Sequence, residues 1–310
     1  MRIVVYGIGG VGGYFGGKLA KSGVHITFIA RGEHLHAITT SGLQVRSIYG
    51  DFIAYPDKVT ANIAEVQSPD LILLAVKTWQ LEEVARSIQP HLEDHTLVMP
   101  LQNAVNNIEK LQSILPPNQI LGGLCRIISF VEGPGRIWHK AFHPQILFGE
   151  VNNEKTKRIA EVQKAFNTAG IDNKIPDNIQ LAIWQKFLFI ATLSGLGALT
   201  RAEIGVMRST PQVRELMLQV AGEICLLARA KGIGLNEQDV ARVMATIDKQ
   251  DPHTTASMQR DLMEGRPSEL EDFNGYIVKE ASRWKVPVPV NQFIYSCLLP
   301  MELKARQPNP

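Results

Sequence analysis

Residues 2–12 read RIVVYGIGGVG, and this stretch decides how the first part of the chain folds. Arg2–Tyr6 has the apolar, β-branched composition of a short buried strand, and glycines stand at positions 7, 9 and 12 directly after it. Val11 to Leu19 has helical composition, and His25–Ile29 is a second strand-like run. A G-x-G-x-x-G between a strand and a helix is the fingerprint of a dinucleotide-binding turn. The stretch therefore predicts a Rossmann-type nucleotide site.

Each glycine of the fingerprint has a physical role. Gly7 permits a tight turn, Gly9 lets a pyrophosphate approach the backbone, and Gly12 allows the helix to pack closely on the strand. The N–H groups and the dipole of the helix N-terminus then favour the anion. The alternatives are a glycine-rich turn without a ligand, and FAD or S-adenosylmethionine sites, which share parts of the pattern. The predicted cofactor loop consists of Gly7, Ile8, Gly9, Gly10, Val11 and Gly12.

The second strand ends in Ile29-Ala30-Arg31, and this ending bears on the choice of cofactor. Enzymes that use NAD carry Asp or Glu about 20 residues beyond the fingerprint, where the carboxylate binds the ribose hydroxyls. Arg31 stands there instead, and a guanidinium attracts the 2′-phosphate that a carboxylate would repel. The sequence therefore predicts NADP(H), with a solvated loop arginine as the alternative.

The first half of the chain alternates short apolar runs with amphipathic stretches, which is typical of βαβ units around a parallel sheet. Further strands are expected over Leu71–Val76 and Thr96–Pro100, and a β-rich stretch with a glycine turn over residues 120–151. After Pro176 the pattern becomes helical. We expect an α/β protein: an N-terminal Rossmann-type, doubly wound sheet in residues 1–176 and a C-terminal all-helical domain in residues 177–310.

The bulk composition excludes some classes of partner. A chain of 310 residues with a formal net charge of +2 and no basic run gives no basis for binding nucleic acid or a membrane surface. Cys125, Cys225 and Cys297 lie far apart, which fits reduced thiols in the cytoplasm. His91 and His95 are spaced as metal ligands can be, but no third ligand accompanies them. No metal site is expected.

Lys186 is the only charged residue between Asn178 and Thr200. We interpret this apolar segment as a core helix that runs into a glycine-rich segment, because a spanning helix would not carry a lysine near its middle. The ammonium group lies among apolar neighbours such as Trp184 and Phe187. It either extends to solvent or is held in a cleft, where its pKa falls and it becomes a proton donor.

The order and spacing of several short motifs resemble the ketopantoate reductase (2-dehydropantoate 2-reductase) family over nearly the whole chain. Besides the fingerprint and Arg31, the motifs are Val76-Lys77, Gln102-Asn103, Trp184-Gln185-Lys186-Phe187, Ser257-Met258, Glu269 and Asn274-Gly275. The resemblance implies NADPH-dependent reduction of a 2-oxo acid, with 2-dehydropantoate reduced to pantoate in pantothenate biosynthesis. It also implies a homodimer formed through the helical domain.

The resemblance assigns a role to each matching residue. Lys186 would be the general acid, Asn103 would position the nicotinamide and the lysine, and Glu269 would pair with the lysine or a substrate hydroxyl. Lys77 would lie beside cofactor and substrate, and Ser257 would bind the substrate carboxylate. With Ser194, the implied substrate contacts are Lys186, Asn103, Ser257 and Ser194. We expect these residues to meet the glycine loop in a cleft between the two domains.

Three positions depart from the family pattern. Ile190 and Ser194 replace two asparagines that contact polar groups of the substrate, and Ala104 replaces the glycine after Asn103. These departures leave the identity of the 2-oxo acid open. The alternatives are a related 2-hydroxyacid or opine-type dehydrogenase and a non-catalytic NADP-binding regulator.

Overall fold

Five parallel strands form the sheet that the first stretch of sequence predicts. A computed structural model describes residues 1–307 and gives the strand order β5-β2-β1-β6-β7. All four neighbouring pairs are parallel. The order reverses beside β1, so the predicted doubly wound sheet is confirmed. The strands are β1 (Arg2–Tyr6), β2 (His25–Ile29), β5 (Lys58–Thr60), β6 (Leu71–Leu74) and β7 (Leu97–Pro100).

A second sheet has the strand order β10-β9-β3-β4, and β8 also pairs with β9. The long antiparallel hairpin of β8 and β9 accounts for the β-rich stretch predicted over residues 120–151, and its turn includes Gly135, which has a φ of 67°. The sequence analysis did not predict β3, β4 or β10. The strands are β3 (Leu43–Ser47), β4 (Phe52–Ala54), β8 (Leu121–Gly133), β9 (Arg136–Glu150) and β10 (Asp172–Lys174).

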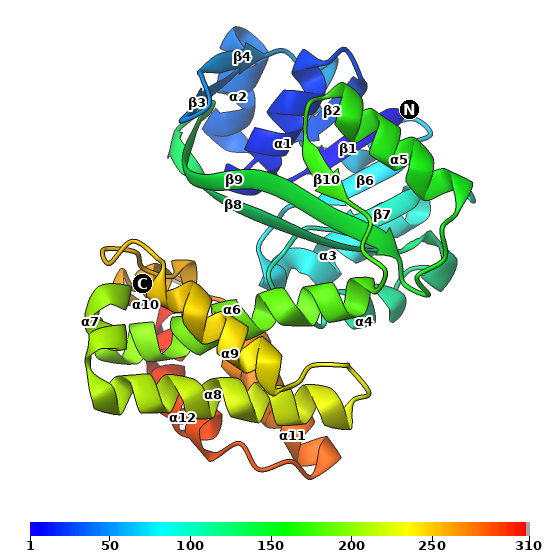
Figure 1. Ribbon diagram of the computed structural model, residues 1–310. Coiled ribbons are helices and arrows are strands. Elements are labelled where there is room, and N and C mark those ends of the chain that lie inside the picture. Colours follow the sequence, from blue (N-terminus) through cyan, green and yellow to red (C-terminus); the bar gives the residue numbers. More distant parts are fainter. Residues whose placement is uncertain (308–310) are drawn as a thin grey trace. The chain divides into compact units, whose positions relative to one another are not determined.

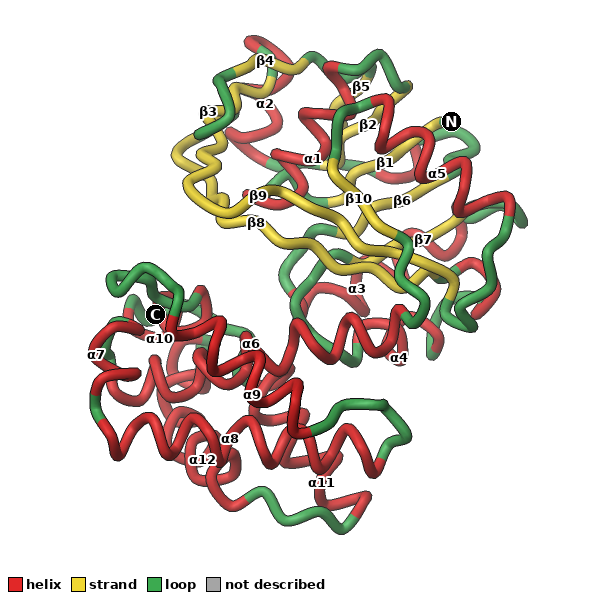
Figure 2. Tube along the Cα trace, viewed as in Figure 1, coloured by secondary structure: helices red, strands yellow, loops and turns green. Residues whose placement is uncertain are grey.

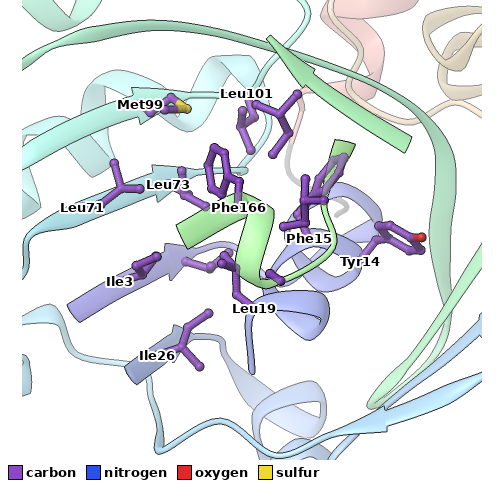
Figure 3. Close-up of a cluster of buried hydrophobic side chains, with 14 of the residues drawn as sticks. Ile3, Tyr14, Phe15, Leu19, Ile26, Leu71, Leu73, Met99, Leu101 and Phe166 are labelled. Carbon is purple, nitrogen blue, oxygen red and sulfur yellow. The ribbon is translucent and has the colours of Figure 1, made fainter. Parts of the chain in front are cut away.

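Helix α1 (Gly10–Lys21) packs between these two sheets, and its glycines make this possible. A Cβ added to Gly16 would lie 2.9 Å from the Phe28 ring of the first sheet. A Cβ added to Gly13 would lie 2.6 Å from Ile137 of the second sheet. Larger residues of α1 fill the gaps between the glycines, and Figure 3 shows Phe15 and Leu19 among the buried side chains of this core. The helix therefore packs against both sheets more closely than residues with a Cβ would allow.

The remaining helices of this first unit connect and cover the sheets. Helix α5 begins after Thr156, whose hydroxyl accepts a hydrogen bond from the Ile159 N–H, and the chain then turns at Gly170 with a φ of 60°. Phe166 of α5 is fully buried in the same core as α1 (Figure 3). These helices are α2 (Gly32–Ser41), α3 (Leu81–Ile88), α4 (Asn107–Gln112) and α5 (Lys157–Thr168).

Within residues 1–307, the second unit consists of helices and loops, and the strands belong to the first unit (Figures 1 and 2). Of the described residues, it includes 180–307 and the short segment 104–106, whereas the sequence-based expectation places the boundary after Pro176. Asn236 caps α9, with its side chain accepting from the Gln238 N–H. The helices are α6 (Ile179–Thr200), α7 (Ile204–Ser209), α8 (Pro211–Ala230), α9 (Glu237–Asp248), α10 (Ser257–Met263), α11 (Tyr276–Trp284) and α12 (Pro289–Ala305).

Helix α6 differs in one respect from the sequence-based expectation. It is a single helix of 22 residues, and the segment expected to follow the core helix is its last part. Gly195 and Gly197 lie inside the helix because other side chains pack against them: Asn274 contacts the first and Gln259 the second. By length and composition α6 could cross a membrane, but 72% of its most apolar window is buried inside the protein. It is the core helix of this unit.

Candidate functional site

The glycine loop has the geometry that each of its glycines was expected to provide. Gly7 has a φ of 95°, which side-chain-bearing residues rarely adopt. A Cβ at Gly12 would overlap the Gly7 carbonyl oxygen, so only glycine allows α1 to approach the end of β1 this closely. An added Cβ at Gly9, in contrast, would meet no atom within 4 Å. The loop is therefore closed on the protein side and open at the glycine that a pyrophosphate would approach.

The N-terminus of α1 presents positive potential at this open position. Gly9 is its N-cap and provides no capping side chain, and the first turn contains no acidic residue. The first N–H groups of a helix have no partner within the helix, so they and the helix dipole favour an anion at this point.

Unpartnered polar atoms mark the carboxyl ends of four strands of the parallel sheet. Thr78 follows β6, Gln102 follows β7, and His34 lies in the first turn after β2. Ser129 belongs to β8, but its backbone lies against Gly10, just beyond β1. Among the buried side-chain atoms without a hydrogen-bond partner, those beside these strand ends are Thr78 Oγ1, Gln102 Oε1 and Nε2, His34 Nε2 and Ser129 Oγ. Buried polar groups are almost always hydrogen-bonded. This row of unpartnered side-chain atoms along one edge of the sheet is therefore consistent with the binding of a polar ligand such as a dinucleotide.

The sequence did not lead us to predict Thr78, Gln102, His34 and Ser129 as binding residues. Thr78 and Gln102 stand within four residues of a predicted strand end, and polar residues there are a usable signal in a parallel sheet. No local signal could indicate Ser129, because its position depends on the fold of the β8–β9 hairpin.

Arg31 lies where the sequence predicted, directly after β2 and at the N-cap of α2. Its side chain is exposed, and within residues 1–307 it makes no ion pair. His34, three residues further on, accepts a hydrogen bond from the Gly135 N–H at 2.9 Å. Burial lowers the pKa of His34, and the nearby Ile8 backbone only partly offsets this effect. A neutral histidine and a solvent-accessible guanidinium thus stand beside the glycine loop.

Lys77 and Asn103 lie at the carboxyl ends of β6 and β7, which are adjacent strands. The Lys77 side chain is exposed, with its Nζ 5.5 Å from the centroid of the Trp79 ring. Asn103 is half-buried. The first unit therefore places the predicted cofactor residues at one edge of one sheet.

In the second unit, Lys186 is half-buried on α6. Its neighbour Phe187 packs edge-on against Phe273, with 5.6 Å between ring centroids. Phe273 in turn belongs to a π-helical turn, Glu271–Gly275, which begins two residues after Glu269. The segments that carry Lys186 and Glu269 are thus packed on each other.

Glu269 is buried, with 5% of its surface exposed, and the chain on both sides of it is fixed. Its carbonyl oxygen accepts hydrogen bonds from Asp272 and Phe273. On the other side, Ser268 donates both its N–H and its hydroxyl to the buried carboxylate of Glu302. Arg306 pairs with the same carboxylate at 2.7 Å. π-Helical turns often occur at functional sites, and this one follows a firmly anchored acid.

Ser257 and Arg260 share the partly exposed side of α10. Arg260 donates to the carbonyl and hydroxyl oxygens of Thr255, and in the described part of the chain it forms no salt bridge. Burial lowers the pKa of Arg260, and the nearby Asp261 opposes the effect. This half-buried cation beside Ser257 was not predicted from the sequence, and it suits an anionic ligand.

Ser194 and Ile190, the two departures on α6, have different environments. Ser194 is fully buried, and its hydroxyl donates to the Ile190 carbonyl oxygen of the preceding turn at 2.8 Å. Ile190 is only partly buried. The face of α6 that continues from Lys186 therefore presents an alkyl side chain, and the serine proton is used within the helix.

Neither histidine considered for a metal lies on an α-helix. His91 ends a short 3-10 turn, and His95 lies in a loop with its Nε2 3.3 Å from Asp70. Residues 1–307 contain no group of three or more His, Cys, Asp or Glu side chains that could hold a metal ion.

The sheet order, the glycine loop and the row of unpartnered polar atoms define a dinucleotide-binding protein of the Rossmann type with an added helical unit. Comparison with known proteins makes the class specific. Residues 3–153 match the family model described as ketopantoate reductase PanE/ApbA, and residues 178–302 match the model of its C-terminal part. The chain belongs to the ketopantoate reductase family, and it is an oxidoreductase.

Individual relatives agree over almost their full length. The chain is 30% identical to an uncharacterized oxidoreductase, YkpB, of Bacillus subtilis, over 96% of this chain and 98% of that protein. It is 28% identical to a 2-dehydropantoate 2-reductase of Nostoc, over 95% and 93% of the two chains. Among solved structures, a PanE/ApbA family ketopantoate reductase of Ralstonia eutropha superposes with a TM-score of 0.90 at 29% identity, covering 99% of this chain and 100% of that one.

The contrast between Gly9 and Gly12 gives a matched pair of alanine substitutions. Gly12→Ala should destabilise the fold by about 1–3 kcal/mol or more, because overpacking forces α1 away from β1. Gly9→Ala should leave the thermal midpoint nearly unchanged but weaken nucleotide binding, because its methyl group occupies the open side of the loop. Thermal unfolding and nucleotide titration of both variants measure this. A Gly9→Ala protein that is as destabilised as Gly12→Ala would contradict our description of the loop.

Proposed function

We propose that the protein reduces the C2 carbonyl of a small 2-oxo acid to the 2-hydroxy acid with NADPH, and that 2-dehydropantoate, which gives pantoate, is the first substrate to test. The observation that carries the proposal is Lys186, a half-buried ammonium group and the only charged side chain of α6. An ammonium group in this position can donate a proton to a carbonyl oxygen. The Nostoc relative is named for the same reaction, which supports this choice of substrate.

The proposed chemistry divides the two transferred hydrogens between cofactor and protein. Bound NADPH supplies the hydride that reaches the carbonyl carbon. Lys186 donates a proton from its Nζ to the carbonyl oxygen as negative charge develops there, so that an alcohol forms. Asn103 would orient the nicotinamide and the lysine, and Glu269, held between its two anchors, would orient the lysine or a substrate hydroxyl.

Binding of the two ligands divides between the two units in the same proposal. The glycine loop, Arg31 and Lys77 would hold the cofactor phosphates. Ser257 and Arg260 would hold the substrate carboxylate, because a hydroxyl and a half-buried guanidinium suit an anion. Gathering both sets of residues in one cleft between the units is part of the proposal.

A second candidate substrate is a 2-oxo acid with an apolar side chain. Ile190 offers no hydrogen bond, and the Ser194 proton is already used by the Ile190 carbonyl oxygen. A substrate side chain lying along this face of α6 would meet alkyl groups. The departure from the family pattern thus favours a substrate without the hydroxyl of 2-dehydropantoate.

The cellular setting is a further part of the proposal. Cys225 and Cys297 are free thiols and Cys125 is a buried cysteine far from both in the sequence, which supports a reducing compartment, and we place the enzyme in the cytoplasm. Reduction of 2-dehydropantoate there would serve pantothenate biosynthesis. A homodimer formed through the helical unit would fit the exposed apolar side chains of α12, Phe293 and Leu303.

Arg31 should determine the choice between NADPH and NADH. A charge-assisted contact contributes about 1.5–3 kcal/mol, which corresponds to roughly ten- to a hundredfold in affinity. We expect Arg31→Ala to remove most of the preference for NADPH and to leave NADH affinity nearly unchanged, measured by fluorescence titration. Equal affinities for the two cofactors in the unmodified protein would refute this role.

Lys186 should be required for turnover and not for cofactor binding. Lys186→Met keeps the length and the apolar stem, so the protein should fold at least as well. Its kcat should fall by about 10²–10⁴-fold, the usual contribution of a general acid, while the Kd for NADPH changes little. Steady-state kinetics and titration test both statements. Near-full turnover by Lys186→Met would mean that another group, with Lys77 the first to examine, donates the proton.

A pair of substrates that differ by one hydroxyl decides between the two candidates. We expect 3,3-dimethyl-2-oxobutanoate, the deoxy analogue, to be reduced with kcat/KM at least equal to that for 2-dehydropantoate, because the α6 face provides no partner for the hydroxyl. Ile190→Asn should shift the ratio toward 2-dehydropantoate by about tenfold, the value of one hydrogen bond. An active site that hydrogen-bonds a substrate hydroxyl discriminates against the analogue without it by about 10⁴-fold in kcat/KM. A preference of that size for 2-dehydropantoate in the unmodified protein would identify 2-dehydropantoate as the substrate and contradict the apolar candidate.

A further inference from the structure

Gln102 is the most unusual member of the row of unpartnered polar groups. Only 8% of its surface is exposed, and neither Oε1 nor Nε2 makes a hydrogen bond. Its backbone, in contrast, is well held, because the Asn107 side chain donates to the Gln102 carbonyl oxygen and the preceding Leu101 N–H donates to Leu74. The position of the residue is thus fixed while its amide group is left without a partner.

Such an arrangement costs stability. Leaving a buried donor or acceptor unsatisfied costs about 1–3 kcal/mol, and Gln102 leaves one of each. A methionine of similar length would fill the same space without this cost. Thr78, 1% exposed and also unpartnered at Oγ1, repeats the pattern at the end of the adjacent strand β6. A ligand with both a donor and an acceptor would satisfy the amide.

The strand order indicates which part of the cofactor lies there. The chain passes from β1 to β2 on one side and to β6 and β7 on the other. Arg31 after β2 would mark the side of the adenosine, and the pyrophosphate would lie over the glycine loop between the two sides. The opposite end of the dinucleotide, the nicotinamide, would then extend over the carboxyl ends of β6 and β7, after which Thr78 and Gln102 stand.

We propose that the side-chain amide of Gln102 hydrogen-bonds the carboxamide of the nicotinamide ring. A carboxamide presents one carbonyl acceptor and one NH2 donor, which match the two open atoms of the glutamine. The contact would fix the rotation of the ring about its glycosidic bond, and so would select the face from which hydride leaves. The inference rests on the proposed use of a nicotinamide cofactor, but it does not depend on the identity of the 2-oxo acid.

The test compares two ligands that differ in the nicotinamide. For Gln102→Met, we expect NADPH affinity to fall by about 3- to 30-fold, as for one or two hydrogen bonds, in a titration followed by nicotinamide fluorescence. The affinity for 2′,5′-ADP, which lacks the nicotinamide, should stay within about twofold by calorimetry. The thermal midpoint of the unligated variant should be equal to or higher than that of the unmodified protein, because an unsatisfied amide has been removed.

Gln119→Met is the matched control. Gln119 is also buried, with 4% of its surface exposed, but it lies near the amino end of β7. There its Nε2 donates to the Glu93 carbonyl oxygen at 2.5 Å, while its Oε1 makes no hydrogen bond. This substitution should lower the thermal midpoint and leave both affinities unchanged. We therefore expect Gln102→Met to weaken NADPH binding without loss of stability, and Gln119→Met to lower stability without weakening NADPH binding.

Two results would overturn the inference. Unchanged NADPH affinity in Gln102→Met would mean that water or nothing fills the position, and an equal loss of 2′,5′-ADP affinity would mean that the residue supports the fold. Unmodified protein that binds neither NADPH nor NADH would refute the proposed cofactor as well. If the unmodified protein binds NADH more tightly than NADPH, the comparison uses NADH and ADP-ribose in place of NADPH and 2′,5′-ADP. Gln102→Met should then weaken the binding of NADH and leave that of ADP-ribose unchanged.

Discussion

The first unit depends on the close packing of helix α1 against two sheets, which is possible only because glycines without a Cβ lie at the points of contact. Gly12 and Gly16 bring the helix onto the parallel sheet, and Gly13 and Gly17 bring its other side onto the second sheet. Side chains of ordinary size at these positions would separate the layers and open the core, since protein interiors tolerate neither overlap nor empty space. The same close packing fixes the helix N-terminus against the end of β1, so the anion-binding loop is a consequence of how the core is filled.

This packing also explains why the β8–β9 hairpin takes part in the site. Gly10 has no side chain, so the backbone of Ser129 can lie directly on the start of α1. A polar side chain from the second sheet is thereby brought to the edge of the first. Together with His34, Thr78 and Gln102 it leaves polar atoms unsatisfied along the carboxyl ends of the strands. Stability is given up where a ligand would restore it, which is a common property of binding sites.

The helical unit uses buried charge differently. Glu223 accepts from the first N–H groups of α12, and Glu302 at the other end of that helix holds Ser268 and Arg306. Both carboxylates are satisfied by several donors, as a buried charge requires. They fix α12 and the segment leading into the π-helical turn, and so they hold Glu269 in place. Charged groups that anchor the framework are saturated, whereas Arg260 keeps part of its guanidinium available.

The sequence by itself determined the features that depend on neighbouring residues: the strands β1 and β2, the glycine loop, the position of Arg31 and the change from α/β to helix. Composition and spacing are enough for these because each is set by contacts within about one strand–turn–helix unit. Only the tertiary structure decided that α6 is one continuous helix, since Asn274 and Gln259 fill the space beside its glycines. It also decided that a π-helical turn follows Glu269 and that the side-chain amide of Gln102 makes no hydrogen bond. These features depend on which distant segments meet and which polar atoms they satisfy, and no local spacing of residues specifies that pairing.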